Sequence, residues 1–414
     1  MVKTLTRATL VALVAYMAVS MARSGRLDSL FVLSAGPIQV YLGDLLLLAV
    51  VLLLLREFVL KDGRRLPTAN RRVVFLVFAY CAYQIAVVLP VSVIFHDLEP
   101  IAVTRQIEGR LGLILIPFVY LVVLRCVSPR AVVALVNVAA GLLALYAIYS
   151  YATVGPLYDS GTRLRELWGG ASLLFGFLVL TSLFLARPSL VAYAAAVLGL
   201  VGVALTNHRS AYLALLAVGV PLFFHFRRAS SRTVVVLFVA VSAAALLVTA
   251  SPTIRESAYY SLRTMVNPDA DNNSRDRVDR SRLGWEYFVA YPLGDYTWNQ
   301  RYYLVDLAYP FEPHNFVVQI LDEQGIVGFA LFAAVIVLTV RVAWRNRAAD
   351  QMSAVMLAYF VFYLGFCLFN TNILNQANVL LFGVAVALIL RGNAELEGRD
   401  VLGEGTQEPP RPAR

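Results

Sequence analysis

The chain has 414 residues, of which 59% are hydrophobic and only 15% are charged, and its formal net charge is +9. A soluble protein is usually about 45–50% apolar and about 25% charged. The excess apolar surface has to face lipid, which excludes an ordinary soluble enzyme, a disordered chain and a nucleic-acid-binding module.

Long uncharged runs predict an all-α polytopic membrane protein. A helix that crosses the hydrocarbon core needs roughly 20 mostly apolar residues. Runs of this kind predict about twelve spans, at 8–22, 38–55, 73–95, 111–124, 131–154, 171–186, 190–206, 211–226, 233–250, 326–340, 352–369 and 377–390. Residues 1–22 also fit a cleaved signal peptide, and this alternative leaves the rest of the topology unchanged.

The distribution of positive charge predicts the orientation of these spans, because cytoplasmic loops retain Lys and Arg. With the N-terminus inside, alternating spans place 21 of the 35 Lys and Arg residues in inside segments. Both termini are then cytoplasmic. Most of the net positive charge therefore reports topology, whereas the arginines left on the outer side favour an anionic ligand there.

The predicted spans divide the chain into four regions. Residues 1–250 hold the first nine spans, and residues 326–391 hold the last three. Between them, residues 251–325 form one long outer loop, in which 255–266 and 282–290 are predicted to be short helices and 267–281 a polar, turn-rich loop. Residues 392–414 are predicted to be a disordered cytoplasmic tail.

Chemistry-bearing side chains are scarce, and those on the outer side stand out. The pair Asp269 and Asp271 opens like a calcium loop, but Ser274 and Arg280 occupy the positions where such a loop needs glycine and glutamate, so no metal site is predicted. His314 ends the outer loop in the sequence Pro-His-Asn-Phe, on the side where the arginines collect. An imidazole with an ordinary pKa of about 6.5 suits a general base at neutral pH.

Three motifs in the second half of the chain carry a family resemblance. The first is Asn207-His208-Arg209-Ser210-Ala211. The second is Ser281-Arg282-Leu283-x-Trp285 followed by Pro292-Leu293-Gly294. The third is His314-Asn315-x(7)-Glu323-x-Gly325-Ile326-Val327-Gly328. In this order, and among predicted spans, they resemble the O-antigen ligase and polymerase superfamily over residues 200–330.

The resemblance implies a GT-C-like membrane glycosyltransferase of the bacterial inner membrane, whose active site faces the periplasm. Its donor would be a glycan linked to undecaprenyl pyrophosphate, and its acceptor a sugar hydroxyl of lipid A–core or of another glycan. No cofactor and no nucleic-acid partner are implied; membrane lipid surrounds the chain.

Residue roles follow from the same resemblance and agree with the chemistry. Guanidinium groups stabilise a pyrophosphate leaving group without a metal ion. We assign this role to Arg209 and Arg282, with Arg280 and Arg110 as further donor-binding residues. By resemblance His314 is the general base, and Asn315 orients it or the acceptor. The expected reaction is a single displacement with inversion at the anomeric carbon.

Several alternatives remain open from the sequence. A ligase joins the glycan to lipid A–core and is the favoured reading, whereas a polymerase adds it to another carrier-linked glycan; both need the same donor site. A transporter of lipid-linked sugars would be expected to show repeated halves and charges within its spans. Arg282 can instead pair with Asp276, Asp279 or Glu286, and Arg209 can anchor at lipid headgroups.

Overall fold

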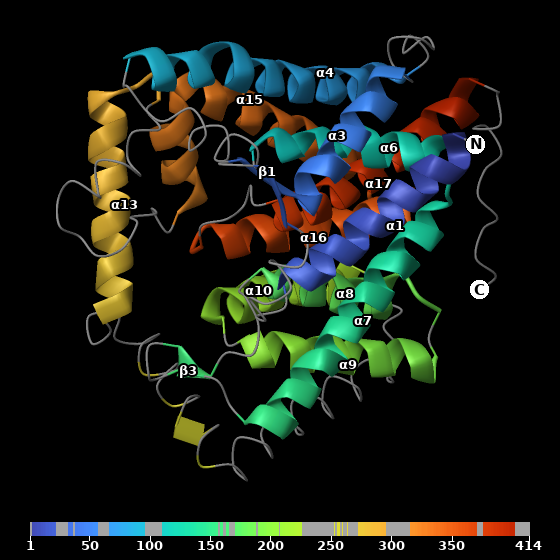
Figure 1. Ribbon diagram of the computed structural model, residues 1–414. Helices are drawn as coiled ribbons and strands as arrows, with labels where there is room; N and C mark the ends of the chain where they lie inside the picture. The colour runs from blue at the N-terminus through green and yellow to red at the C-terminus, as the bar shows by residue number, and fades with distance from the viewer. Residues whose placement is uncertain are drawn as a thin grey trace.

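The computed structural model describes residues 2–21, 32–35, 38–56, 66–95, 110–155, 158–159, 163–164, 170–187, 189–206, 208–225, 272–294, 315–370 and 376–401, with five isolated positions between 252 and 263. These parts are almost entirely helical (Figure 1). The helices are α1 (Val2–Met21), α3 (Leu42–Leu54), α4 (Thr68–Tyr83), α6 (Leu115–Arg125), α7 (Pro129–Val154), α8 (Ala171–Phe184), α9 (Leu190–Thr206), α10 (Arg209–His225), α13 (Asn272–Ala290), α15 (Phe316–Asn346), α16 (Gln351–Cys367) and α17 (Gln376–Val401).

Short irregular elements complete the described chain. Two π-helical turns, η4 (Gln84–Val88) and η5 (Val91–Phe95), follow α4, and a 3-10 turn, η6 (Gly112–Ile114), leads into α6. Two small antiparallel hairpins pair β1 (Val32–Ala35) with β2 (Ile38–Tyr41), and β3 (Tyr158–Asp159) with β4 (Arg163–Leu164). In the first hairpin Val32 lies opposite Tyr41, and in the second Tyr158 lies opposite Leu164.

Eleven of the predicted spans correspond to apolar helices, although not all of these are long enough to cross a bilayer. Five described helices have the required length and composition: Lys3–Met21, Thr68–Ile94, Pro129–Val154, Phe316–Asn346 and Asn378–Glu397. Six shorter apolar helices are Asp44–Leu54, Gly112–Arg125, Ala171–Phe184, Leu190–Thr206, Ser210–Leu222 and Gln351–Cys367. The predicted span at 233–250 lies outside the described residues. The chain is thus a helical membrane protein, and the number twelve stays a prediction.

Three boundaries differ from the sequence prediction. The predicted span 38–55 starts with strand β2, so its helix begins only at Leu42. The polar loop predicted at 267–281 is wrong from Asn272 onward, because α13 begins there and packs one face against α15. The disordered tail predicted from residue 392 is likewise wrong up to Val401, since α17 continues to that point and Arg391 pairs with Glu395 one turn later at 2.9 Å.

Local sequence signals set where several helices start. Ser128 precedes α7, its hydroxyl accepts a hydrogen bond from Ala131 N at 3.2 Å, and Pro129 occupies the first helical position. Asp350 caps α16 in the same manner, by accepting from Met352 N and Ser353 N. These residues satisfy backbone N–H groups that have no partner within the helix.

The bundle has a fully enclosed centre. Every residue of α17 from 378 to 390 is buried, as is nearly all of α8. Figure 1 shows α4 and α15 along one side, α6 and α17 in the middle, and α8, α9 and α10 along the other side. Close approach of α8 and α9 depends on glycine: a methyl group on Gly202 would come within 2.7 Å of the Phe175 ring. Small residues commonly allow this kind of contact between membrane helices.

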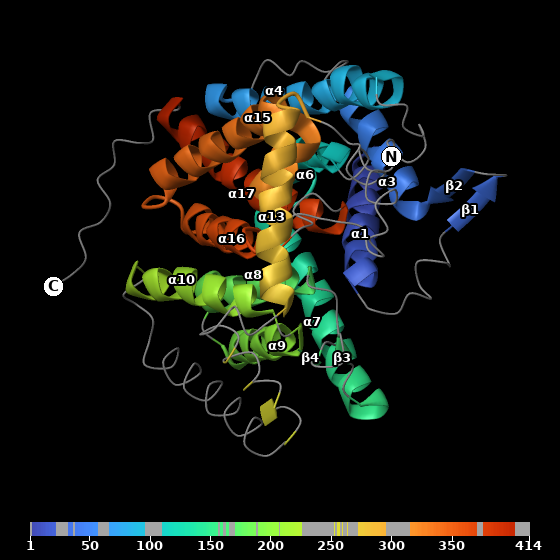
Figure 2. The ribbon, with the colours of Figure 1, turned by 90° about the vertical axis from the view of Figure 1, so that its left-hand side faces the viewer.

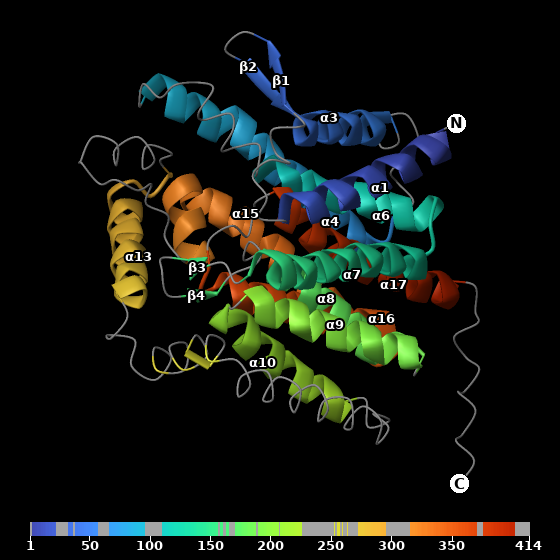
Figure 3. The same ribbon diagram turned by 60° about the horizontal axis from the view of Figure 1, so that its bottom comes forward.

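The two ends of the bundle differ in what they carry. Helix α13 stands across one end, beside the first part of α15 (Figures 1 and 2). We call this the α13 end. Figure 3 shows that the start of α1 and the last turns of α17 lie at the opposite end.

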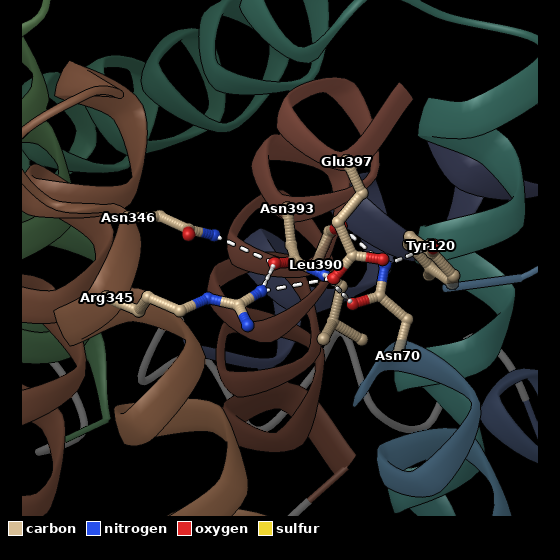
Figure 4. A network of polar contacts seen from close by, with 7 residues as sticks. All are labelled: Asn70, Tyr120, Arg345, Asn346, Leu390, Asn393 and Glu397. Carbon is tan, nitrogen blue, oxygen red and sulfur yellow. Dashed lines mark hydrogen bonds and ion pairs between the residues drawn. The ribbon is translucent and has the colours of Figure 1, made fainter. Parts of the chain in front are cut away.

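At that opposite end a buried polar network joins four helices (Figure 4). Asn393 of α17 lies at its centre and is fully buried. Its carboxamide donates to Asn70 Oδ1 at 2.9 Å and to Glu397 Oε1 at 3.0 Å, and accepts from Asn346 Nδ2 at 3.1 Å and from Arg345. Asn70 in turn donates to Tyr120 Oη at 2.6 Å and to the Leu390 carbonyl at 2.7 Å.

We expect Asn393→Leu to destabilise the bundle, because Asn70 and Asn346 then lose a buried hydrogen-bond partner. A buried group left unsatisfied costs about 1–3 kcal/mol, so the free energy of unfolding should fall by about 2 kcal/mol or more. Thermal unfolding of the purified protein in detergent measures the change. Glu395→Gln at the same end removes only an exposed ion pair and serves as the control. Equal melting of both variants would contradict a stabilising role for the network.

Candidate active site

The second and third sequence motifs meet at the α13 end. Gly294 has φ +93° and Gly325 has φ +66°, and the two glycine backbones lie against each other. A Cβ atom on either one would overlap the backbone of the opposite segment. The Pro292 carbonyl accepts a hydrogen bond from Ile326 N at 2.9 Å. Both glycines are therefore required by positive φ and by close approach.

This contact falls at a break in α15. Gly325 is non-helical, and it separates a short first part, 316–324, from the long part that crosses the bundle. Figure 1 shows the first part turned alongside α13. Tyr83, at the end of α4, holds the break in place: its hydroxyl donates to the carbonyl of Gln324 at 3.0 Å or of Leu293 at 3.3 Å. The predicted span 326–340 lies in the second part.

The first motif reaches the same end through residues 369–370, which follow α16. Asn370 Nδ2 donates to Ser210 Oγ at 2.7 Å, at the start of α10. The neighbouring carbonyl of Phe369 accepts a hydrogen bond from Arg277 Nη1 of α13 at 3.1 Å. Residues 369–370 thus connect the Arg209–Ser210 turn to α13. Nothing in the sequence distinguishes this linking turn, because it belongs to none of the three motifs.

The predicted site residues on α13 lie on different faces of that helix. The residues at 277, 280, 281, 284, 287 and 288 share the inner face, and Gly284 is buried there. Arg280 belongs to this half-buried face. Arg282 points to the other side; its side chain is 68% exposed and lies 3.7 Å from Glu286, one of the acidic partners anticipated from the sequence. Trp285 is also exposed, beside Phe288.

Asn315 has a defined structural position. It is the N-cap of α15, and its side-chain oxygen accepts hydrogen bonds from Val317 N at 2.9 Å and Val318 N at 3.4 Å. His314, the predicted general base, precedes this cap and lies outside the described residues. Arg209 is the first residue of α10, and its side chain also lies outside the description. His208 before it is buried against Phe366, with ring centroids 5.7 Å apart.

Arg110 occupies a buried polar cluster together with the first part of α15. Its guanidinium forms an ion pair with Glu323, which is 1% exposed. The other carboxylate oxygen of Glu323 accepts from Gln319 Nε2 at 2.9 Å. Asp322 and Gln324 beside it are equally buried, and Gln84 donates to Gln324 Oε1 at 3.1 Å. Sequence reasoning identified Glu323 only as part of a motif and did not identify Gln319, Gln84 or Tyr83.

Described residues of the three motifs, far apart in sequence, thus lie together at one end of a helical membrane bundle. A comparison with known proteins matches the part of the chain that contains them. Residues 194–333 match the family model of the O-antigen ligases. The match confirms the predicted resemblance to the O-antigen ligase superfamily. No curated protein matches the chain.

The matched segment runs from α9 into the second part of α15 and includes all three motifs. Five of the six predicted site residues lie within it, namely Arg209, Arg280, Arg282, His314 and Asn315. Arg110 lies about 80 residues before the segment and contacts it through the ion pair with Glu323. Helices outside the family segment thus contribute to the same polar region.

Proposed function

We propose that the chain is a glycosyltransferase of the O-antigen ligase type. It would transfer polysaccharide from undecaprenyl pyrophosphate to a sugar hydroxyl of lipid A–core, at the periplasmic face of the bacterial inner membrane. One observation supports the proposal: described residues of all three motifs in the matched segment lie close together at the α13 end. With the α13 end at the periplasmic face, both chain termini would lie in the cytoplasm.

Donor binding rests on the arginines in this proposal. The leaving pyrophosphate gains negative charge as the glycosidic bond breaks, and planar guanidinium groups stabilise that charge by paired hydrogen bonds. Arg209 at the start of α10, Arg110 at the start of the segment leading into α6, and an arginine of α13 would supply them without a metal ion. On α13 the inner face favours Arg280 over Arg282.

The acceptor hydroxyl needs a base, because an alcohol is a poor nucleophile until its proton is removed. His314 would accept that proton while the hydroxyl attacks the anomeric carbon from the side opposite the pyrophosphate, so the anomeric configuration inverts. Asn315 fixes the backbone directly after His314 by capping α15. We therefore assign Asn315 the role of holding the base in place.

Reconstitution tests the function. Purified protein in vesicles receives undecaprenyl-pyrophosphate glycan together with two competing acceptors, lipid A–core and a second carrier-linked glycan. Glycan on lipid A–core alone is the expected product, with inverted configuration at the new linkage. A growing ladder on the carrier would instead identify a polymerase of the same superfamily. Retention of the donor's configuration would overturn the single-displacement mechanism.

The position of the α13 arginines leads to a separate prediction. Arg280→Ala should lower transfer by about 100-fold or more, the loss typical of removing one preorganised donor to a developing charge. Arg282→Ala should lower transfer by less than about threefold, because an exposed ion pair with Glu286 contributes little. Initial rates at fixed donor concentration compare the two variants. The reverse order of effects would show that the outer face of α13 binds the donor.

A further inference from the structure

The buried cluster of Arg110, Glu323 and Gln319 holds a charge pair in a position where apolar residues would suffice for packing. Arg110 is 8% exposed, Glu323 1% and Gln319 3%. Each carboxylate oxygen of Glu323 has its own partner: one bonds the Arg110 guanidinium and the other accepts from Gln319 Nε2 at 2.9 Å. The carboxylate is therefore fixed from two sides.

The cluster lies in line with the catalytic end of α15. Asn315, Gln319 and Glu323 follow one another at intervals of four residues and so share a face of the helix. Glu323 is about 12 Å along the helix from the Asn315 cap. The face thus runs from the cap that directly follows His314 in the sequence to the carboxylate that pairs with Arg110, and the proposed function assigns these two residues to the base and to donor binding. Gln319 Oε1, on the same face, has no hydrogen-bond partner among the residues that the structure describes.

The break at Gly325 makes this arrangement depend on tertiary contacts. The short part 316–324 carries Gln319 and Glu323, and the ion pair ties that part to Arg110, at the start of the segment leading into α6. Arginine has a long side chain with several rotamers, whereas a carboxylate held on both oxygens selects one orientation of the guanidinium plane. The guanidinium plane therefore keeps a fixed direction.

We propose that Glu323, itself held by Gln319, is a positioning residue that orients Arg110 toward the donor pyrophosphate. The inference rests on the proposed function, since it assigns a task within the same donor site. A purely structural ion pair makes a different prediction. Replacing both charges of such a pair by apolar residues of similar volume is often neutral or stabilising, whereas a donor-binding Arg110 cannot be replaced in this way.

The experiment uses the full-length protein and compares Glu323→Gln with the double variant Arg110→Met/Glu323→Leu. Transfer from undecaprenyl-pyrophosphate glycan is measured as KM for donor, KM for acceptor and kcat, with thermal unfolding in detergent alongside. Glu323→Gln should raise the donor KM by about tenfold or more and leave the acceptor KM unchanged. The double variant should unfold at or above the wild-type temperature and still lose about 100-fold in transfer.

A matched control comes from the other end of the bundle. Arg391→Met/Glu395→Leu removes an ion pair of 2.9 Å that is remote from the α13 end, and should transfer glycan as the wild type does. Recovery of wild-type transfer by the Arg110→Met/Glu323→Leu variant overturns the inference and makes the pair structural. If the double variant does not fold, the single variant decides: equal changes of both KM values, or no change, also overturn it.

The same assay separates this inference from the proposed function. If both the wild type and the Arg110→Met/Glu323→Leu variant transfer glycan, the proposed function stands and only the positioning role of Glu323 is ruled out. If the wild type does not transfer glycan and is not stabilised against thermal unfolding by added undecaprenyl pyrophosphate, both proposals are ruled out.

Discussion

Replacing His314 by alanine is expected to reduce glycan transfer by about 100- to 10,000-fold, the usual contribution of a positioned general base. The acceptor hydroxyl then keeps its proton during attack, while the arginines still bind the donor. The donor KM should change little, so the loss should appear in kcat. Transfer to lipid A–core in vesicles, with quantified membrane insertion of the variant, measures both quantities.

Two further variants sharpen this test. His225→Ala changes a histidine at the far end of α10 and should leave transfer unchanged. Asn315→Ala removes the cap of α15 while keeping the base; we expect a smaller loss, which Asn315→Asp should partly restore, because aspartate is also a good N-cap. Full activity of His314→Ala would contradict the assigned base, and a chain that moves lipid-linked sugar without forming a glycosidic bond would be a transporter.

Replacing Gly325 by alanine is expected to cause the largest structural loss. The backbone there has φ +66°, which costs a non-glycine residue about 1–3 kcal/mol, and the added methyl group would overlap the backbone of Leu293. The Pro292–Gly294 turn then cannot stay on the break in α15. Thermal unfolding in detergent should show a loss beyond the conformational cost alone, and transfer should fall with it because the first part of α15 moves.

Two other glycines separate the causes of this effect. Gly155 also has a positive φ, of +82°, but a Cβ atom there meets nothing within 4 Å. Gly155→Ala should therefore show only the conformational cost. Gly219 lies within α10 with open space around it, so Gly219→Ala should be neutral or stabilising, as alanine is favoured over glycine in a helix. A Gly325→Ala variant as stable as Gly155→Ala would argue against the tight backbone contact.

The helical membrane character of the chain was predictable because it depends on composition and on run length. Uninterrupted apolar stretches leave the backbone no alternative to helix in lipid. The prediction failed where a helix consists largely of polar residues. Residues 272–281 contain Asn, Ser and Asp, and they form the first half of α13 because its inner face packs on α15. It failed likewise at 392–401, where Asn393 and Glu397 form hydrogen bonds with residues of two other helices, α4 and α15.

The site was predictable only in part. The motifs marked His314, Asn315, Arg209 and the arginines near 282, because residue order and spacing are visible in the sequence. The motifs did not predict that Arg280 lies on the inner face of α13 and Arg282 on the outer face. The rotation of α13 about its axis is set by contacts with α15 and with the Phe369 carbonyl. Tyr83, Gln84 and Gln319 carry no motif at all; their importance lies in their buried partners.

The sequence by itself determined that this is a helical membrane protein and that three motifs resemble one superfamily. These properties are local sums and spacings. Only the tertiary structure decided that Arg110 pairs with Glu323, which lies 213 positions later in the sequence. It also decided that the backbones of Gly294 and Gly325 are in contact at the break in α15. The arginines that first suggested an anion site therefore differ in their surroundings: Arg110 pairs with a buried carboxylate, Arg277 donates to the Phe369 carbonyl, and Arg282 is exposed. The physical reason is that burial and helix rotation depend on neighbours distant in sequence, which spacing alone does not specify.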